Sequence, residues 1–177
     1  MNESTIRPAT RSDIETIRDL AHRIWPETYI PVIGREQVEY MLDLMYSSES
    51  LAKQMDDGAR FLLVSDGSMP VGFASYQEIE PAIYKLHKLY VLPAEQGKGT
   101  GRKIIDNIIS QIKPAGAKAL RLQVNRNNKA KNFYEKFGFK IREEIKLDIG
   151  QGFYMDDYIM ELTIEHEPAA GTVSPNA

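Results

Sequence analysis

The chain of 177 residues is predicted to fold as one α/β (α+β) domain. The expected architecture is a mixed, mostly antiparallel sheet of about six to seven strands with helices on both faces. Two observations predict this class. A hydrophobic fraction of 42% at this length is enough for one sizeable core. The periodic segments follow the order strand, helices, three strands, helix, strand, helix and two strands, without an internal repeat or an interdomain linker.

The individual elements follow from apolar periodicity and from the glycines and prolines that interrupt it. Apolar or alternating segments predict strands at residues 5–8, 60–65, 71–78, 84–92, 119–125, 139–149 and 154–164. Apolar residues at helical spacing predict helices at residues 11–25, 38–45, 48–55, 104–112 and 130–137. Thr10 and Asp13 form an approximate capping box before the first helix.

Residues 25–31 are predicted to form a loop after the first helix. Pro26 and Pro31 interrupt the helical pattern there, because proline lacks the N–H that a helix interior needs. We therefore expect Trp25 and Tyr29 to be exposed in this loop.

Composition excludes several classes of protein. A net charge of −3 argues against a general nucleic-acid binder, and no apolar run is long enough to predict a membrane span. The first residues show no signal-peptide pattern, so we expect a cytoplasmic protein. Without cysteine there is no disulfide or thiolate nucleophile, and the three histidines show no metal-ligand spacing, so no metal is expected.

The segment 96–102, Gln-Gly-Lys-Gly-Thr-Gly-Arg, lies between a predicted strand and an isoleucine-rich helix. Glycines let the backbone approach a ligand closely, and the first turn of a helix offers unpaired N–H groups to a phosphate. This predicts a pyrophosphate-binding turn. A Walker A loop would need Ser or Thr in place of Gly99, and a dinucleotide fingerprint would need a glycine in place of Arg102 or Ile104.

Two motifs resemble those of a known family. Gln96-x-x-Gly99-x-Gly101 resembles the acetyl-CoA loop of the GCN5-related N-acetyltransferases, the GNAT family. The stretch 127–139 resembles the family's second signature, an Asn-capped helix with a Phe-Tyr pair and a Gly-Phe stop. The resemblance implies a GNAT domain over residues 1–164. Residues 165–177 lack any apolar pattern, which predicts a disordered tail.

The same resemblance implies the chemistry and the donor site. Acetyl-CoA would be the co-substrate, attacked directly by a primary amine, and a strand N–H near Leu89 or Tyr90 would stabilise the oxyanion of the tetrahedral intermediate. The residues implied in binding acetyl-CoA are Leu89, Tyr90, Val91, Gln96, Gly97, Lys98, Gly99, Thr100, Gly101, Arg102, Asn125, Asn127 and Tyr134.

This chemistry sets two proton transfers. An amine with a pKa of about 10 must lose a proton, and the departing thiolate is better protonated as it leaves. Tyr134 aligns with the family's general acid, and the alternative is a core aromatic beside Phe133. His87 on the central strand is a candidate base. Glu78, Glu80 or a water chain without a single base are the alternatives.

The acceptor is expected to be a small amine or a polyamine. In the family the early loop, here with Trp25 and Tyr29, helps to wall the acceptor site; packing against the sheet is the alternative. Asp156 and Asp157 lie in a stretch loosely similar to bacterial spermidine/spermine acetyltransferases, and they would attract a polycation or be a solvated strand edge.

Alternative functions remain. The acceptor would then be a protein N-terminus or lysine, or the chain would be a non-catalytic acetyl-CoA-binding regulatory module. A nucleotide-binding switch is disfavoured by the missing Walker Ser or Thr. Since family members are often dimers, a homodimer is expected.

Overall fold

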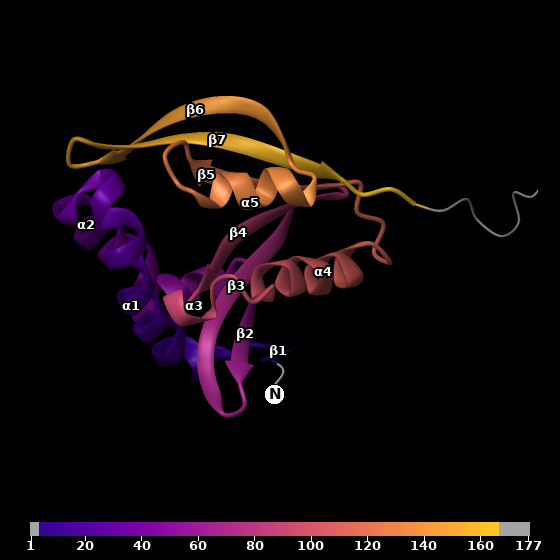
Figure 1. Ribbon diagram of the computed structural model, residues 1–177, viewed down its shortest axis with the longest axis horizontal. Coiled ribbons are helices and arrows are strands. Elements are labelled where there is room, and N and C mark those ends of the chain that lie inside the picture. The colour runs from indigo at the N-terminus through magenta and orange to yellow at the C-terminus, as the bar shows by residue number, and fades with distance from the viewer. Residues whose placement is uncertain (1–3, 167–177) are drawn as a thin grey trace, which may run out of the picture.

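The computed structural model describes residues 4–166 and arranges seven strands in one mixed sheet, in the spatial order β1-β2-β3-β4-β5-β7-β6 (Figure 1). The strands are β1 (Ser4–Pro8), β2 (Arg60–Asp66), β3 (Met69–Glu80), β4 (Ile83–Val91), β5 (Ala119–Asn125), β6 (Lys140–Gly150) and β7 (Phe153–Thr163). The helices are η1 (Arg11–Asp13), α1 (Ile14–Ile33), α2 (Arg35–Tyr46), α3 (Ser48–Asp56), η2 (Pro93–Glu95), α4 (Thr100–Ile112) and α5 (Ala130–Phe137). The predicted fold class is confirmed.

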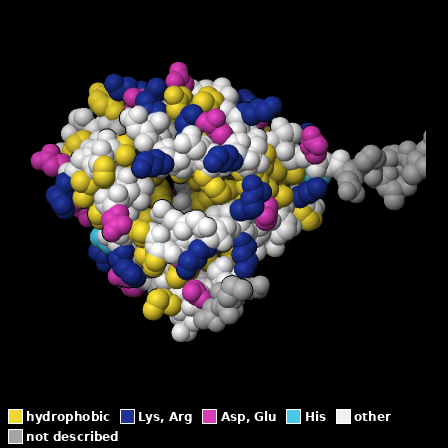
Figure 2. Space-filling model, viewed as in Figure 1, with side chains coloured by type: hydrophobic (Ala, Val, Ile, Leu, Met, Phe, Trp, Pro, Cys, Tyr) yellow, Lys and Arg dark blue, Asp and Glu magenta, His cyan; other side chains and the backbone are white. Residues whose placement is uncertain are grey.

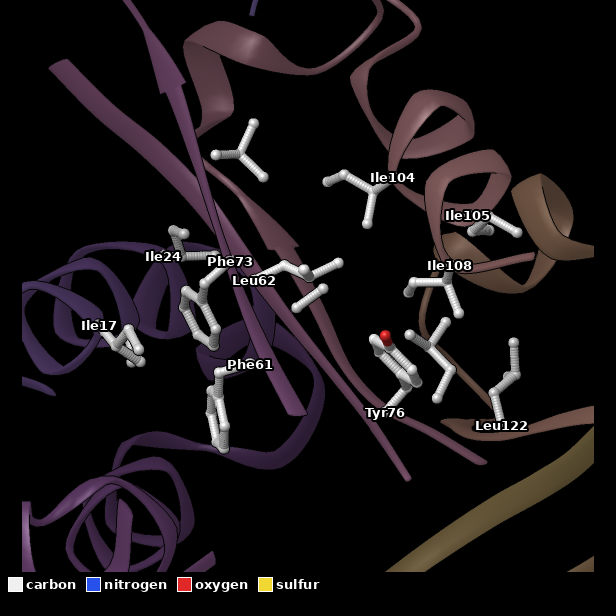
Figure 3. Packing of buried hydrophobic residues seen from close by; sticks show 14 of the residues in the cluster. Ile17, Ile24, Phe61, Leu62, Phe73, Tyr76, Ile104, Ile105, Ile108 and Leu122 are labelled. Atoms are coloured by element: carbon white, nitrogen blue, oxygen red, sulfur yellow. The ribbon is translucent and has the colours of Figure 1, made fainter. Parts of the chain in front are cut away.

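The core has two layers, one on each face of the sheet (Figure 3). Ile17 and Ile24 of α1 pack with Phe73 on one face, and Ile104 and Ile108 of α4 pack on the other. All five side chains are at most 1% exposed. Since burial of such a side chain stabilises the fold by about 1.5–3 kcal/mol, these layers fix both helix groups on the sheet.

β4 and β5 form a parallel pair, and they are paired only over the first residues of each strand. Ile83 to Leu86 pair with Ala119 to Leu122, and no pairing follows although β4 continues to Val91 and β5 to Asn125. The strands therefore diverge beyond Leu86. Their diverging edges leave backbone groups without a ladder partner, which makes this gap the place where a ligand can complete the sheet.

β4 carries one extra residue opposite β3. Ser75 pairs with Lys88 and Tyr76 pairs with Leu86, so His87 is bulged. Residues paired across strands share a face of the sheet. Tyr76 lies on the α4 side and Phe73, the partner of Tyr90, on the α1 side (Figure 3). The extra residue therefore reverses the alternation of side chains in the second half of β4, so that the side chains of Lys88 and Tyr90 face α1.

The loop predicted at residues 25–31 is wrong, because α1 continues through Pro26 and Pro31 to Ile33. Trp25 and Tyr29 are not exposed: they are 3% and 8% accessible, with ring centroids 4.4 Å apart. An interior proline costs a helix about 3 kcal/mol. Burying two aromatic side chains of roughly 150–250 Å² each, at about 25 cal/mol per Å², more than offsets that cost.

The end of the chain was predicted to be a disordered tail from residue 165. From residue 167 onward this prediction falls outside the residues that the structure describes. His166 is held by a hydrogen bond between its Nε2 and the carbonyl of Ala117 (2.6 Å). None of the helices between residues 4 and 166 is both long and apolar enough to cross a membrane.

Candidate active site

A hollow lies between α4 and α5 on the face of the molecule drawn in Figure 2. Its floor is hydrophobic, and Lys and Arg side chains stand around its rim. The hollow follows the gap where β4 and β5 diverge. An elongated ligand with an apolar arm and negative charges would match an apolar floor with a cationic rim.

The edge of β4 offers backbone groups to this gap. Leu92 N donates to Val71 O (2.8 Å), which fixes the alternation along the antiparallel pair. The backbone N–H and C=O groups of Tyr90 therefore point toward β3, whereas those of Leu89 and Val91 point toward β5. Of the two residues expected to supply a free N–H, Leu89 has the required direction.

The Gly-rich loop ends in the first turn of α4. Gly97 and Gly99 have φ of 82° and 81°, in the left-handed region that favours glycine. The first helical hydrogen bond runs from Lys103 N to Gly99 O (3.1 Å). Within residues 4–166 the N–H groups of 97–102 donate to no backbone acceptor. They point outward at the positive end of a 13-residue helix, an arrangement that suits phosphate.

Glu95 stabilises this loop from its buried side. Its carboxylate is only 7% exposed, accepts from Thr100 Oγ1 (3.2 Å) and lies 3.4 Å from Lys98 Nζ. Sequence reasoning missed Glu95, because its role depends on burial and a spacing of five residues to Thr100 is no known motif. The contact with Glu95 keeps the ammonium group of Lys98 beside the loop.

The third glycine, Gly101, lies at the contact between α4 and α5. A Cβ on Gly101 would lie 3.1 Å from Phe133 Cζ, so any larger residue there would require the Phe133 ring to shift by a few tenths of an ångström. The next residue of α4 adds a second contact: the Arg102 guanidinium lies 4.6 Å from the centre of the Phe137 ring. These contacts hold the two helix starts side by side at the hollow.

The signature stretch 127–139 begins at Asn127, but the asparagine whose side chain accepts from α5 is the next one. Asn128, not Asn127, accepts from the helix, through its Oδ1 and Ala130 N (2.9 Å). The reason is the local turn, in which Asn127 N is bound by Asn125 Oδ1 (2.9 Å) and the Asn127 side chain is left exposed. Asn128 also donates from Nδ2 to the hydroxyl of Tyr29 (3.1 Å).

Tyr134 is buried on α5, between Phe133 (ring centroids 5.3 Å apart) and Phe139 (5.6 Å). Its hydroxyl makes no hydrogen bond with any residue from 4 to 166. Burial raises the pKa of Tyr134 above its usual value, and nearby Tyr29 adds to this. The phenol therefore keeps its proton at neutral pH and has it free to donate.

A second cavity of about 180 Å³ lies on the opposite face of the sheet, under α1 and α2. It is lined by Trp25, Tyr29, Ile33, Gln37, Met41, Met45, Tyr46, Lys85, His87, Lys88, Tyr90, Gln123, Asn125, Tyr154, Met155 and Asp157. The β6–β7 hairpin closes one side by two hydrogen bonds to α2. Gln37 Nε2 donates to Tyr154 O, and the Tyr40 hydroxyl donates to Ile149 O, both at 2.6 Å.

Two lysines, a histidine and an aspartate line this cavity. Burial lowers the pKa of Lys88 to about 8, with a smaller contribution from Lys85, whose own pKa is lowered by burial. Loss of hydration and the two lysines lower the pKa of His87 to about 4, although the residue is exposed at the mouth of the cavity. Burial raises the pKa of Asp157, which accepts from Gln123 Nε2 (2.8 Å).

The two halves of the site meet at a cluster of aromatic residues. The hydroxyls of Tyr29 and Tyr90 are 3.0 Å apart, and Trp25 packs on both rings. Through Asn128 this cluster reaches the start of α5, the helix that carries Tyr134. Trp25 and Tyr29 thus line the cavity from a helix and also pack against the sheet.

Other candidate residues lie elsewhere. Glu78 and Glu80 are exposed at the end of β3 and do not line the cavity; Glu80 Oε2 lies 3.5 Å from Arg121. Asp156 points away from the cavity and pairs with Arg126 (2.9 Å). Of the two neighbouring aspartates only Asp157 lines the cavity. Among residues 4–166 no cluster of three or more His, Asp or Glu side chains could hold a metal ion.

Comparison with known proteins places this geometry in a family. A family model described as an acetyltransferase (GNAT) domain matches residues 29–153. An uncharacterized N-acetyltransferase of Mycobacterium tuberculosis is 29% identical over 152 residues, which cover 84% of this chain and 96% of that protein. A spermidine N(1)-acetyltransferase of Thermoplasma acidophilum is 28% identical over 144 residues, or 78% and 89% of the two chains.

A solved structure agrees with the sequence relatives. The crystal structure of the PaiA N-acetyltransferase from Thermoplasma acidophilum, in complex with coenzyme A, superposes with a TM-score of 0.77 at 27% identity. It covers 92% of this chain and 99% of its own. The family model, which spans more than half of the sequence, and the matching topology lead to one conclusion: the chain belongs to the GNAT family of N-acetyltransferases.

Proposed function

We propose that the protein transfers the acetyl group of acetyl-CoA to the primary amine of a small molecule. The observation that carries this proposal is the gap between β4 and β5, which lies between the hollow at α4 and α5 and the cavity under α1 and α2. A donor bound on one face and an acceptor bound on the other would meet there.

The residues present fit acetyl-CoA. Its phosphates would bind the free N–H groups of 97–102, beside Lys98 and the cationic rim. Its pantetheine arm would lie along Leu89 and Val91, with the exposed side chain of Asn127 near by. Acetyl-CoA supplies an acetyl group activated as a thioester.

The transfer would be direct: one C–N bond forms, one C–S bond breaks, and the intermediate is tetrahedral. The Leu89 N–H would donate to the acetyl oxygen, on which negative charge develops. Tyr134 would give its proton to the departing sulfur.

Asp157 is better placed than His87 to take the proton that the amine loses. A pKa of about 4 makes the His87 ring a weak base, whereas Asp157 is the one carboxylate among the cavity-lining residues within 4–166. Its position at the cavity also lets it hold the ammonium form of the acceptor before the proton leaves, directly or through water.

A thiol-release assay with acetyl-CoA tests the proposal. The acceptor panel should contain amino acids, polyamines, aminoglycosides and short peptides, with coenzyme A binding measured separately by calorimetry. Turnover on a small amine supports the proposal. Coenzyme A binding without turnover on any acceptor would contradict it and favour a non-catalytic binding module.

A polyamine is the second candidate for the acceptor, favoured by the similarity to a spermidine N(1)-acetyltransferase. A protein N-terminus or lysine is less favoured, because the β6–β7 hairpin closes one side of the cavity against α2. A GNAT domain over residues 1–164, a cytoplasmic location and a homodimer remain parts of the proposal; size-exclusion chromatography with light scattering measures the last.

A further inference from the structure

The cavity under α1 and α2 contains a buried ammonium group without an anionic partner. Lys88 is 8% exposed, and its Nζ lies 5.0 Å from the centre of the Tyr46 ring. Among residues 4–166 neither Lys88 nor Lys85 forms an ion pair or a side-chain hydrogen bond. A buried charge without an anionic partner is costly, so an anionic group bound beside Lys88 would be stabilised.

The bulge at His87 is what brings these cations into the cavity. Lys85 lies before the bulge and Lys88 after it, and in a regular strand residues three apart would point to opposite faces. With His87 inserted, both lysines line the same cavity. The arrangement is thus built into the backbone of β4.

The charges of the cavity do not match a polycation. Its lining residues within 4–166 include Lys85 and Lys88 as cations and Asp157 as the single anion, with the His87 ring neutral near pH 7. A polyamine would add several positive charges beside two lysines and would find one carboxylate. An acceptor with one positive and one negative group matches the cavity better.

We propose that the acceptor is an aminocarboxylate, with its carboxylate bound by Lys88 and Lys85 and its amine held by Asp157. This inference rests on the proposed function and names the class of acceptor for the same site. The amine and the carboxylate must be a few bonds apart to fit within about 180 Å³. Lys88 acts here as a specificity-determining residue and does not take part in the bond changes.

Matched acceptors test the inference. The kcat and KM for amino acids are compared with those for the corresponding amino acid amides and for polyamines, using thiol release. We expect kcat/KM to be about 10- to 100-fold higher for the carboxylates, the range expected for one hydrogen bond to a charged group. A preference for the amides or for polyamines would overturn the inference and leave the proposed function standing.

Variants of Lys88 test whether this residue causes the preference for carboxylates over amides. Lys88→Met should raise KM for the carboxylates about 10- to 100-fold and leave KM for the amides nearly unchanged. Lys88→Arg should keep the preference. Lys140→Met, an exposed lysine at the start of β6, is the matched control. Coenzyme A affinity and circular dichroism verify folding. An unchanged carboxylate-to-amide ratio in Lys88→Met would overturn the inference.

A binding measurement keeps the two proposals separate. If no acceptor is acetylated, the proposed function fails, and the same pairs are titrated by calorimetry into protein saturated with coenzyme A. Binding of the carboxylate that Lys88→Met weakens at least 10-fold would still support the carboxylate site. No binding, or equal binding of carboxylate and amide, would overturn it.

Discussion

Asn128 joins two helices that are a hundred residues apart in the chain: its Oδ1 accepts from the first turn of α5, and its Nδ2 donates to the Tyr29 hydroxyl on α1. One side chain therefore links the wall of the cavity under α1 and α2 to the helix that carries Tyr134.

Asn128→Ala should lower the free energy of unfolding by about 1–2 kcal/mol, because the first turn of α5 loses its cap. Asn127→Ala is the control, since the Asn127 side chain is exposed and caps nothing. Denaturant unfolding measures both. Equal destabilisation by the two variants would contradict the assignment of the cap.

Gly99→Ala should weaken coenzyme A binding, because a Cβ at φ 81° strains the turn that aims the free N–H groups. Gly116→Ala is a matched control: its φ is 92°, a Cβ there also meets nothing within 4 Å, and it lies after α4, at the other end from the loop. Both variants should lose about 1 kcal/mol of stability, and only Gly99→Ala should change the affinity measured by calorimetry. Similar affinities for the two variants would argue against phosphate binding at this loop.

Tyr134→Phe should reduce kcat by about 10²- to 10⁴-fold while coenzyme A affinity stays unchanged, because only the proton donor is removed. Tyr76→Phe, at another buried tyrosine, controls for loss of a phenol elsewhere in the core. Steady-state kinetics with saturating acceptor measures the effect. A Tyr134→Phe enzyme with normal kcat would mean that Tyr134 is only a packed aromatic.

Stability should rise with pH between about 8 and 10.5 through Lys88. Its pKa is about 8 when folded and 10.5 when unfolded, so the unfolded chain binds more protons in that window. The groups that face it are Lys85, His87, Tyr90, Tyr46 and Asp157.

Lys88→Met should remove this rise, which is on the order of 3 kcal/mol. Urea unfolding of both proteins from pH 7 to 10.5 measures the difference, with Lys140→Met as the control. Parallel pH profiles for the wild type and Lys88→Met would show that Lys88 keeps an ordinary pKa.

Pro26→Ala should stabilise the protein by roughly 1–3 kcal/mol, because an alanine restores the N–H of an interior helical position. Thermal unfolding measures this, and Pro31→Ala in the last turn should give a smaller gain. A loss of stability would show that the ring of Pro26 is needed for the burial of Trp25 and Tyr29.

The sequence predicted the fold and the position of the Gly-rich loop well because both depend on local patterns. The seven strands follow from alternation, and the loop at 96–102 follows from glycine spacing before an amphipathic helix. The helix through Pro26 was not predictable in this way, because its stability comes from the burial of Trp25 and Tyr29 in a tertiary context that a local pattern does not contain.

The cavity under α1 and α2 was the least predictable part of the candidate site. Trp25, Tyr29 and His87 were singled out as candidates, but Lys85 and Lys88 were not, since regular alternation puts them on opposite faces of β4. Only the pairing of Ser75 with Lys88 and of Tyr76 with Leu86 reveals the extra residue. The cap at Asn128 was missed for a similar reason, as it depends on the turn that Asn125 forms.

The short parallel pairing of β4 with β5 affects the distance between the cation of Lys88 and the carboxylate of Asp157. Lys88 belongs to β4, whereas Asp157 belongs to β7 and reaches the cavity across β5. The span between cation and anion is thus set by the position at which the pairing of Leu86 with Leu122 ends. Strand pairing changes only in steps of whole residues, so the spacing between Lys88 and Asp157 can change only in discrete steps, and the length of acceptor that the proposed site admits would change in the same steps.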